Sequence, residues 1–157
     1  MSPSVSVSPS ISPSVSPSLS PEWLGYSRGS EVGLPADDTE LGTAYTEQNY
    51  TDVETKNNVR VAQTSEGDYA IHQFKVYVDA SAVTVDLECE VQTNYSPTLE
   101  TVYLQIYNYN STTWETVDSN NSADEDTDFI LSGTIESLTN YRSGSFVVTC
   151  RVHQKMT

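Results

Sequence analysis

The chain has 157 residues and an acidic composition, with 22 Asp and Glu against seven Lys and Arg and a net charge of −15. Its length suits one ordinary domain plus a tail. Because a charge of this sign repels phosphate groups, nucleic acid and anionic membranes are set aside as direct partners. The sequence has no apolar run long enough to span a bilayer and begins without the basic and apolar regions of a secretory signal peptide, so we expect no membrane insertion.

Residues 1–21 form a tail with a strict two-residue period. Every even position from Ser2 to Ser20 is serine, and the odd positions from Pro3 to Pro21 carry proline or an aliphatic residue. Proline excludes a helix and disfavours a central strand, so we expect an extended or polyproline-like chain with one apolar and one hydroxyl edge. Its reach of roughly 66 Å suits an anchor or a stalk that docks in a groove of a partner or bundles with its copies. The predicted anchor residues are Val5, Val7, Ile11, Val15, Leu19 and Trp23, and a disordered linker is the alternative.

Residues 22–56 are expected to be an irregular transition segment. Frequent glycine, together with Pro35, interrupts regular structure, so loops and one short strand are predicted. An apolar cluster directly follows the tail and could plug against the domain or a neighbouring subunit; it consists of Trp23, Leu24 and Tyr26.

Residues 57–157 carry regular strand signals separated by turn residues. Period-2 alternation predicts strands at 59–63, 69–79, 82–92, 101–110, 114–117, 128–135 and 144–154. In the run 82–92 the odd-numbered residues from Val83 to Val91 are expected to face inward. No segment has the pattern of a long amphipathic helix. We predict an all-β, jelly-roll-like β-sandwich of about seven or eight strands, preceded by the extended Ser/Pro-repeat tail.

The run Thr101–Trp114 is the centre of this prediction. Val102, Leu104 and Ile106 fall on one face and form the expected core. The opposite face is aromatic and looks accessible, and sugar rings pack well on such side chains. The candidate ligand or interface residues are therefore Tyr103, Tyr107, Tyr109 and Trp114. Burial of this face under a second sheet or a sister subunit, and plain solvent exposure, are the alternatives.

Few residues could hold a metal or a cofactor, and we expect none. Two cysteines and two histidines are too few for a probable structural zinc site. Cys89 and Cys150 lie in strand-like runs, where they are either two small buried side chains or a disulfide between core strands. A weak calcium candidate is the acidic loop with Asp124, Asp126 and Asp128, but it lacks the spacing and glycine of an EF-hand and is interpreted as a solvated loop.

Several short motifs occur between residues 45 and 155, namely Tyr107-Asn108-Tyr109-Asn110, Trp114, Thr127-Asp128, Leu131-Ser132-Gly133 and Arg151-Val152. Together they resemble the pattern of the galactose-binding-like β-sandwich domains of phage and prokaryotic surface structural proteins. Cys150 departs from the usual pattern of the last strand. The resemblance implies the sandwich fold and does not transfer a sugar site. The Ser-Pro repeat is similar to tails of phage appendage and tail-fibre proteins.

These observations favour a non-enzymatic structural protein on the surface of a virion. The expected role is a phage head decoration or tail appendage subunit that forms a homo-oligomer such as a trimer and contacts other virion proteins. Nucleophile-elbow, Cys-His and phosphate-loop motifs are absent from the sequence, so catalysis is not expected. The alternatives are a carbohydrate-binding module that recognises cell-surface glycans and a subunit of an extracellular filament whose tail inserts into the next subunit.

Overall fold

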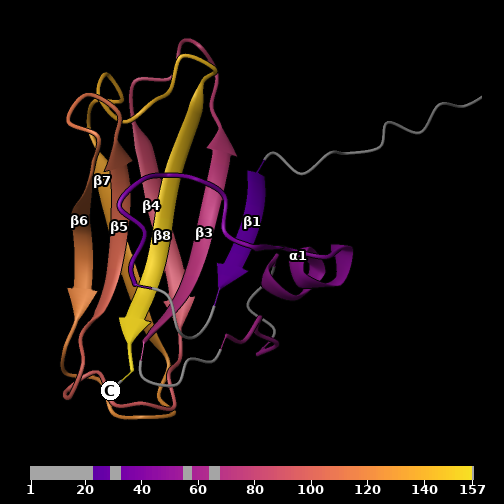
Figure 1. The fold of residues 1–157 in the computed structure, drawn as a ribbon, viewed down its shortest axis with the longest axis vertical. Coiled ribbons are helices and arrows are strands. Elements are labelled where there is room, and N and C mark those ends of the chain that lie inside the picture. The colour runs from indigo at the N-terminus through magenta and orange to yellow at the C-terminus, as the bar shows by residue number, and fades with distance from the viewer. Residues whose placement is uncertain (1–22, 29–32, 55–57, 64–67, 157) are drawn as a thin grey trace, which may run out of the picture.

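The computed structural model describes residues 23–28, 33–54, 58–63 and 68–156. In these residues the chain forms eight strands and one short helix, shown in Figure 1. They are β1 (Trp23–Arg28), β2 (Thr43–Ala44), α1 (Glu47–Val53), β3 (Tyr69–Tyr77), β4 (Val85–Val91), β5 (Val102–Asn108), β6 (Thr113–Asn120), β7 (Phe129–Ile135) and β8 (Val147–Lys155). No helix in this described part of the chain is long and apolar enough to cross a membrane.

The strands form two antiparallel sheets of unequal width. The large sheet has the order β2-β1-β3-β8-β5-β6, and the small sheet consists of β4 and β7. The small sheet lies behind β5 and β8 in the view of Figure 1, and no strand of the described residues faces the β1–β2 flank of the large sheet. The predicted all-β sandwich is therefore confirmed at the level of two antiparallel sheets.

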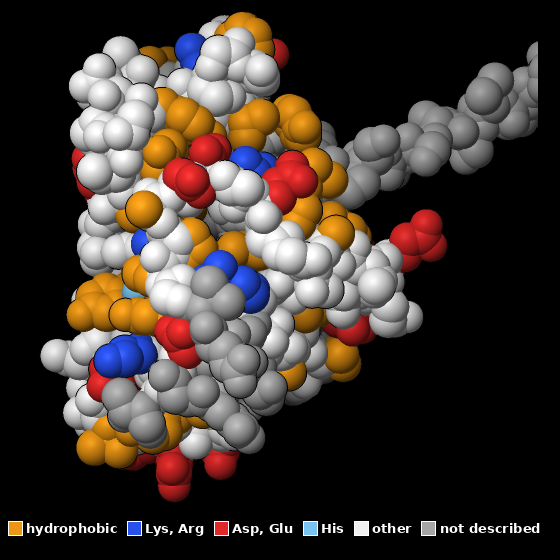
Figure 2. All heavy atoms as spheres, viewed as in Figure 1, with side chains coloured by type: hydrophobic (Ala, Val, Ile, Leu, Met, Phe, Trp, Pro, Cys, Tyr) orange, Lys and Arg blue, Asp and Glu red, His pale blue; other side chains and the backbone are white. Residues whose placement is uncertain are grey.

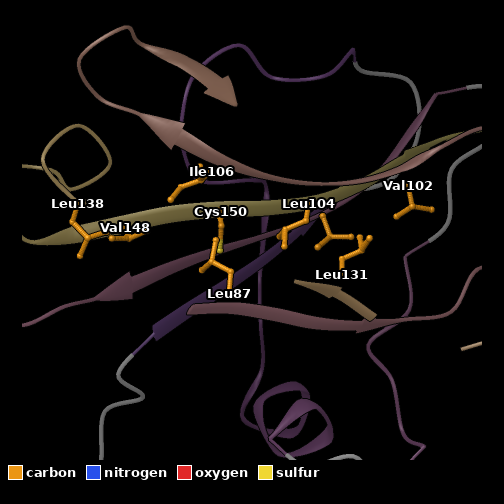
Figure 3. Packing of buried hydrophobic residues seen from close by; sticks show 9 residues of the cluster. Leu87, Val102, Leu104, Ile106, Leu131, Leu138, Val148 and Cys150 are labelled. Atoms are coloured by element: carbon orange, nitrogen blue, oxygen red, sulfur yellow. The ribbon is translucent and has the colours of Figure 1, made fainter. Parts of the chain in front are cut away.

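The main core lies between the two sheets. Period-2 alternation places Val102, Leu104 and Ile106 of β5 on the inner face, and each is at most 2% exposed, as the sequence predicts. Figure 3 shows Leu87 of the small sheet pointing toward Cys150 of the large sheet. Burial of such aliphatic side chains stabilises a fold by about 1.5–3 kcal/mol each.

The segment before residue 57 is more regular than the sequence indicates. β1 and β2 belong to the large sheet, which therefore begins at Trp23. Conversely, the predicted strand at 59–63 is wrong, because this segment forms no strand. Val83 was expected to face inward but is 67% exposed, since β4 begins only at Val85.

Residues 33–42, here called the covering loop, cross the outer face of the large sheet, which is the face turned away from β4 and β7. The loop passes in front of β8 in Figure 1. Its two leucines, Leu34 and Leu41, form a second small core with Tyr26 of β1 and Ile71 of β3. The large sheet is therefore packed on both faces, by the small sheet on one and by the covering loop on the other.

Candidate functional site: a groove beside β4

A cavity of about 790 Å³ lies on the inner face of the large sheet, beside β4. Its floor consists of residues from β3, β5 and β8, which include Phe74, Leu104 and Val152. One wall is β4 with the residues that follow it, because nine consecutive residues, 86–94, line the cavity. The opposite wall is formed by Trp23, Tyr45 and the end of α1, and residues 58–63 complete the rim. This space, called the groove below, exists because the small sheet is narrower than the large one.

The wall opposite β4 is a cluster of aromatic rings. The ring of Trp23 packs edge-on against Tyr45, Tyr50 and Phe74, with centroid distances of 6.2, 4.9 and 5.6 Å. The cluster sits close to the β1 backbone, because a Cβ added at Gly25 would lie 2.5 Å from Cδ2 of Tyr45. Glycine is therefore required at this position for the Tyr45 ring to pack on the strand.

The helix that supports this cluster is held by local hydrogen bonds. Thr46 caps α1 by accepting a hydrogen bond from the Asn49 amide, and the Asn49 side chain accepts from the Thr46 amide, which completes a capping box. The Tyr50 hydroxyl accepts from the Gly25 amide at 3.0 Å and so ties α1 to β1. Trp23, a predicted anchor residue, packs against Tyr50 and so belongs to the same wall of the groove.

Four polar side chains of the groove are neutral at physiological pH, those of Tyr45, His72, Cys89 and Cys150. The Tyr45 hydroxyl lies 2.6 Å from Nδ1 of His72, and burial lowers the pKa of His72 to about 4. The two cysteines are free thiols in facing strands, and burial raises the pKa of Cys89 to about 11 and that of Cys150 to about 12. The groove therefore has an apolar floor with neutral polar groups, while charged side chains, among them Asp52, Arg60 and Asp86, also belong to its lining.

The small sheet packs against β6 on its β7 side. Gly133 of β7 lies against Val117 of β6, where a Cβ would fall 2.4 Å from Cγ1 of the valine. Asp118 of β6 accepts a hydrogen bond from the Ser132 amide at 2.9 Å, so β6 covers the outer side of β7. Among the described residues β4 forms a strand ladder only with β7. Its other side borders the groove, where residues 58–63 form part of the rim.

The aromatic residues predicted to bind a ligand lie elsewhere, on the outer face under the covering loop. The Tyr109 hydroxyl donates to Asp38 at 2.9 Å, and the Trp114 indole donates to the Asp37 carbonyl at 3.1 Å. Tyr107 packs edge-on against both rings and is 6% exposed. The expectation of an accessible ring is therefore wrong for Tyr107, because the chain's own loop covers it.

Arg151 holds this arrangement together and was not identified from the sequence as a site residue. It is 3% exposed, lies 4.0 Å above the Trp114 ring, and donates to Gln105 and to the Pro35 carbonyl of the covering loop. Burial lowers the pKa of Arg151 to about 10, which leaves it charged at neutral pH. The sequence did carry a signal for this role, because Arg151 is the single charged residue in the run 146–152.

The fourth aromatic, Tyr103, is half-buried and stacks on His153 with a centroid distance of 5.4 Å. His153 is itself buried, and burial lowers its pKa to about 3. Figure 2 shows the outer face from the front, where basic side chains lie beside acidic ones. On the outer face Tyr107 is buried, while Tyr103, Tyr109 and Trp114 are half-buried and contact other residues of the chain.

The acidic loop does not assemble a metal site in the described part of the chain. No group of three or more His, Cys, Asp or Glu residues there could hold a metal ion. Asp128 instead forms an ion pair with Arg60 at 2.6 Å, and Asp124 and Asp126 are exposed. The remaining predicted anchor residues, Val5, Val7, Ile11, Val15 and Leu19, lie outside the described residues.

No protein-family model matches this chain, and neither a curated protein nor a solved structure matches it. The resemblance to galactose-binding-like domains therefore stays a prediction.

Proposed function

We propose that the chain is a non-enzymatic structural subunit of a virus particle, a phage head decoration or tail appendage protein that self-associates through its tail. In this role a jelly-roll-like sandwich is displayed at the virion surface, and the tail joins it to sister subunits in a closed oligomer such as a trimer or to other virion proteins.

The observation that carries the proposal is the place of Trp23, the first described residue after the tail, which forms part of one wall of the groove. The tail has a row of proline and aliphatic residues, and the floor of the groove is apolar. An extended segment with an apolar row and an apolar groove are matching parts of an assembly contact. The apolar floor fits a role in assembly better than catalysis.

A filament subunit is the second candidate, because a contact between the tail of one subunit and the body of the next can build either a closed oligomer or a filament. A tail that enters a neighbour makes a head-to-tail contact, which gives a ring if the rotation closes and an open filament if it does not. A finite mass that is independent of concentration supports the ring, and growth with concentration supports the filament. Recognition of glycans by the outer aromatics is no longer favoured, because the covering loop engages Tyr109 and Trp114.

The test is the mass in solution, by light scattering coupled to size exclusion, of the full chain and of a variant lacking residues 1–21. The variant retains every described strand and both cores. We expect an oligomer for the full chain and a monomer for the variant. A monomeric full chain contradicts the self-association on which the proposal rests.

A further inference from the structure

We propose that one end of the sandwich packs against the same end of a second copy, with Phe146 at the centre of the contact. This end, called the β3–β8 end below, consists of residues 77–83, where β3 stops, and residues 138–147, which lead into β8. It lies at the top of Figure 1. The inference rests on the proposed function, since it names a surface through which subunits that are joined by their tails touch one another.

The two segments of the β3–β8 end are bonded to each other. The Val78 amide donates to the Phe146 carbonyl at 2.9 Å, and the Leu138 amide donates to the Val83 carbonyl at 2.8 Å. The guanidinium of Arg142 holds the first segment through three backbone carbonyls, at 3.2, 3.0 and 3.1 Å, which belong to Asp79, Ala80 and Ala82. Because these bonds fix the surface in advance, a partner that binds it has little loop entropy to remove.

Exposed apolar side chains are concentrated at this end. Of the seven large apolar side chains that are exposed among the described residues, three belong to it: Tyr77, Val83 and Phe146. Single exposed apolar residues are normal on a protein surface, but these three are linked by contacts. Tyr77 lies opposite Val147, the neighbour of Phe146 in the chain. Arg142 lies 5.3 Å from the centroid of the Phe146 ring and binds the carbonyl of the residue before Val83. The three side chains therefore share one end of the molecule.

The backbone of Phe146 is unfavourable for its side chain. Its φ is 62°, in the left-handed region that glycine and asparagine tolerate and a bulky residue rarely adopts. The ring is also 43% exposed, so it adds little to the core. Local stability therefore does not account for an aromatic residue at this position. Residues in such conformations are concentrated at functional sites, and aromatic side chains and arginine are both enriched in protein interfaces.

The charge of this end allows two copies to approach each other. Its two segments contain one acidic residue, Asp79, and one basic residue, Arg142, whereas the whole chain has a net charge of −15. The Asp79 carboxylate accepts hydrogen bonds from the amide and the hydroxyl of Ser81 and is thereby engaged within its own loop. Most of the surface of an acidic chain repels a second copy, but this end carries no net charge.

The attachment of the tail favours a second copy over an unrelated partner. Trp23, the first described residue after the tail, lies opposite Val76 and therefore beside Tyr77. Figure 1 shows that β1 begins on the side of the molecule where β3 ends. Subunits that are joined through their tails are thus tethered near the β3–β8 end, which raises the effective concentration of this surface for a sister subunit. The contact adds to the one that the tail makes.

The experiment measures the concentration at which the oligomer of the full chain is half dissociated, by light scattering coupled to size exclusion. Phe146→Asn removes the ring and suits the left-handed backbone, and Tyr77→Ser removes the second exposed ring. Leu99→Asn is the matched control, because it removes a side chain that is 68% exposed next to Glu100, whose carbonyl accepts from Gln154 at the other end of β8. We expect both end variants to raise this concentration about tenfold or more and the control to leave it unchanged.

Circular dichroism checks that each variant is folded, and Tyr77→Ser decides the outcome if Phe146→Asn is not. An oligomer that is unchanged in the end variants overturns this inference and leaves assembly through the tail intact. A control that weakens the oligomer as much as the end variants also overturns it, because the effect would not belong to this end. A full chain that is a monomer at every concentration contradicts the proposed function, and the inference fails with it.

Discussion

Replacing Arg151 with alanine tests whether the covering loop is part of the fold. The change removes the donor to the Pro35 carbonyl and the cation above the Trp114 ring. The half-buried Pro35 carbonyl that loses its donor costs about 1–2 kcal/mol, and the contact with the ring contributes about 1 kcal/mol. Removal of a buried guanidinium, whose hydrogen bonds among the described residues go to neutral oxygens, offsets part of this loss. We therefore expect Arg151→Ala to lower the free energy of unfolding by about 1–2 kcal/mol.

The assay is urea unfolding followed by tryptophan fluorescence, with hydrogen exchange of the Leu41 amide as a local probe of the loop. That amide donates to Gln73 and should exchange faster in the variant. Arg60→Ala is the matched control, because it also removes one positive charge but acts at an exposed ion pair that contributes less than about 1 kcal/mol. Equal free energies of unfolding for Arg151→Ala and the wild type, with unchanged hydrogen exchange at Leu41, would refute the role of Arg151 in holding the covering loop.

Three further predictions concern the groove and the buried titratable groups. Gly25→Ala should destabilise the fold by about 1–3 kcal/mol in urea, because its Cβ meets the Tyr45 ring at 2.5 Å; an unchanged midpoint would contradict this packing. Stability should fall as the pH drops from 6.5 through about 4, because His72 and His153 are buried neutral and the unfolded chain takes up their protons first. Each histidine lowers the free energy of unfolding by at most about 2 kcal/mol at pH 5 relative to neutral pH. Urea midpoints that do not change with pH would contradict this prediction. The native thiols should react slowly with Ellman's reagent and both should react in urea, because burial raises the pKa of each; failure to release two equivalents in urea would reveal a disulfide between Cys89 and Cys150.

The strands after residue 68 were predictable from sequence because their side chains alternate between two distinct environments. Val102, Leu104 and Ile106 are buried as their spacing indicates. The segment 59–63 has a similar alternation but lies on the rim of the groove, outside the sheets. Alternation alone does not identify a strand, because pairing also requires an edge that is within reach.

The two faces of β5 show why the candidate site was harder to predict. Tyr103, Tyr107 and Tyr109 alternate as expected, but what covers them is a loop without periodicity, held by hydrogen bonds between residues more than 70 positions apart. The groove likewise arises from the difference in width between the two sheets, which is a property of topology. Trp23 lies on the wall of this groove, and its predicted role as an anchor residue stays a prediction.

The central claim is that the tail assembles the subunits. Its most direct test is light scattering of the full chain, at several concentrations, and of the variant that lacks residues 1–21, which retains every described strand. The account predicts an oligomer for the full chain and a monomer for the variant. Equal masses per chain for the two proteins would contradict it.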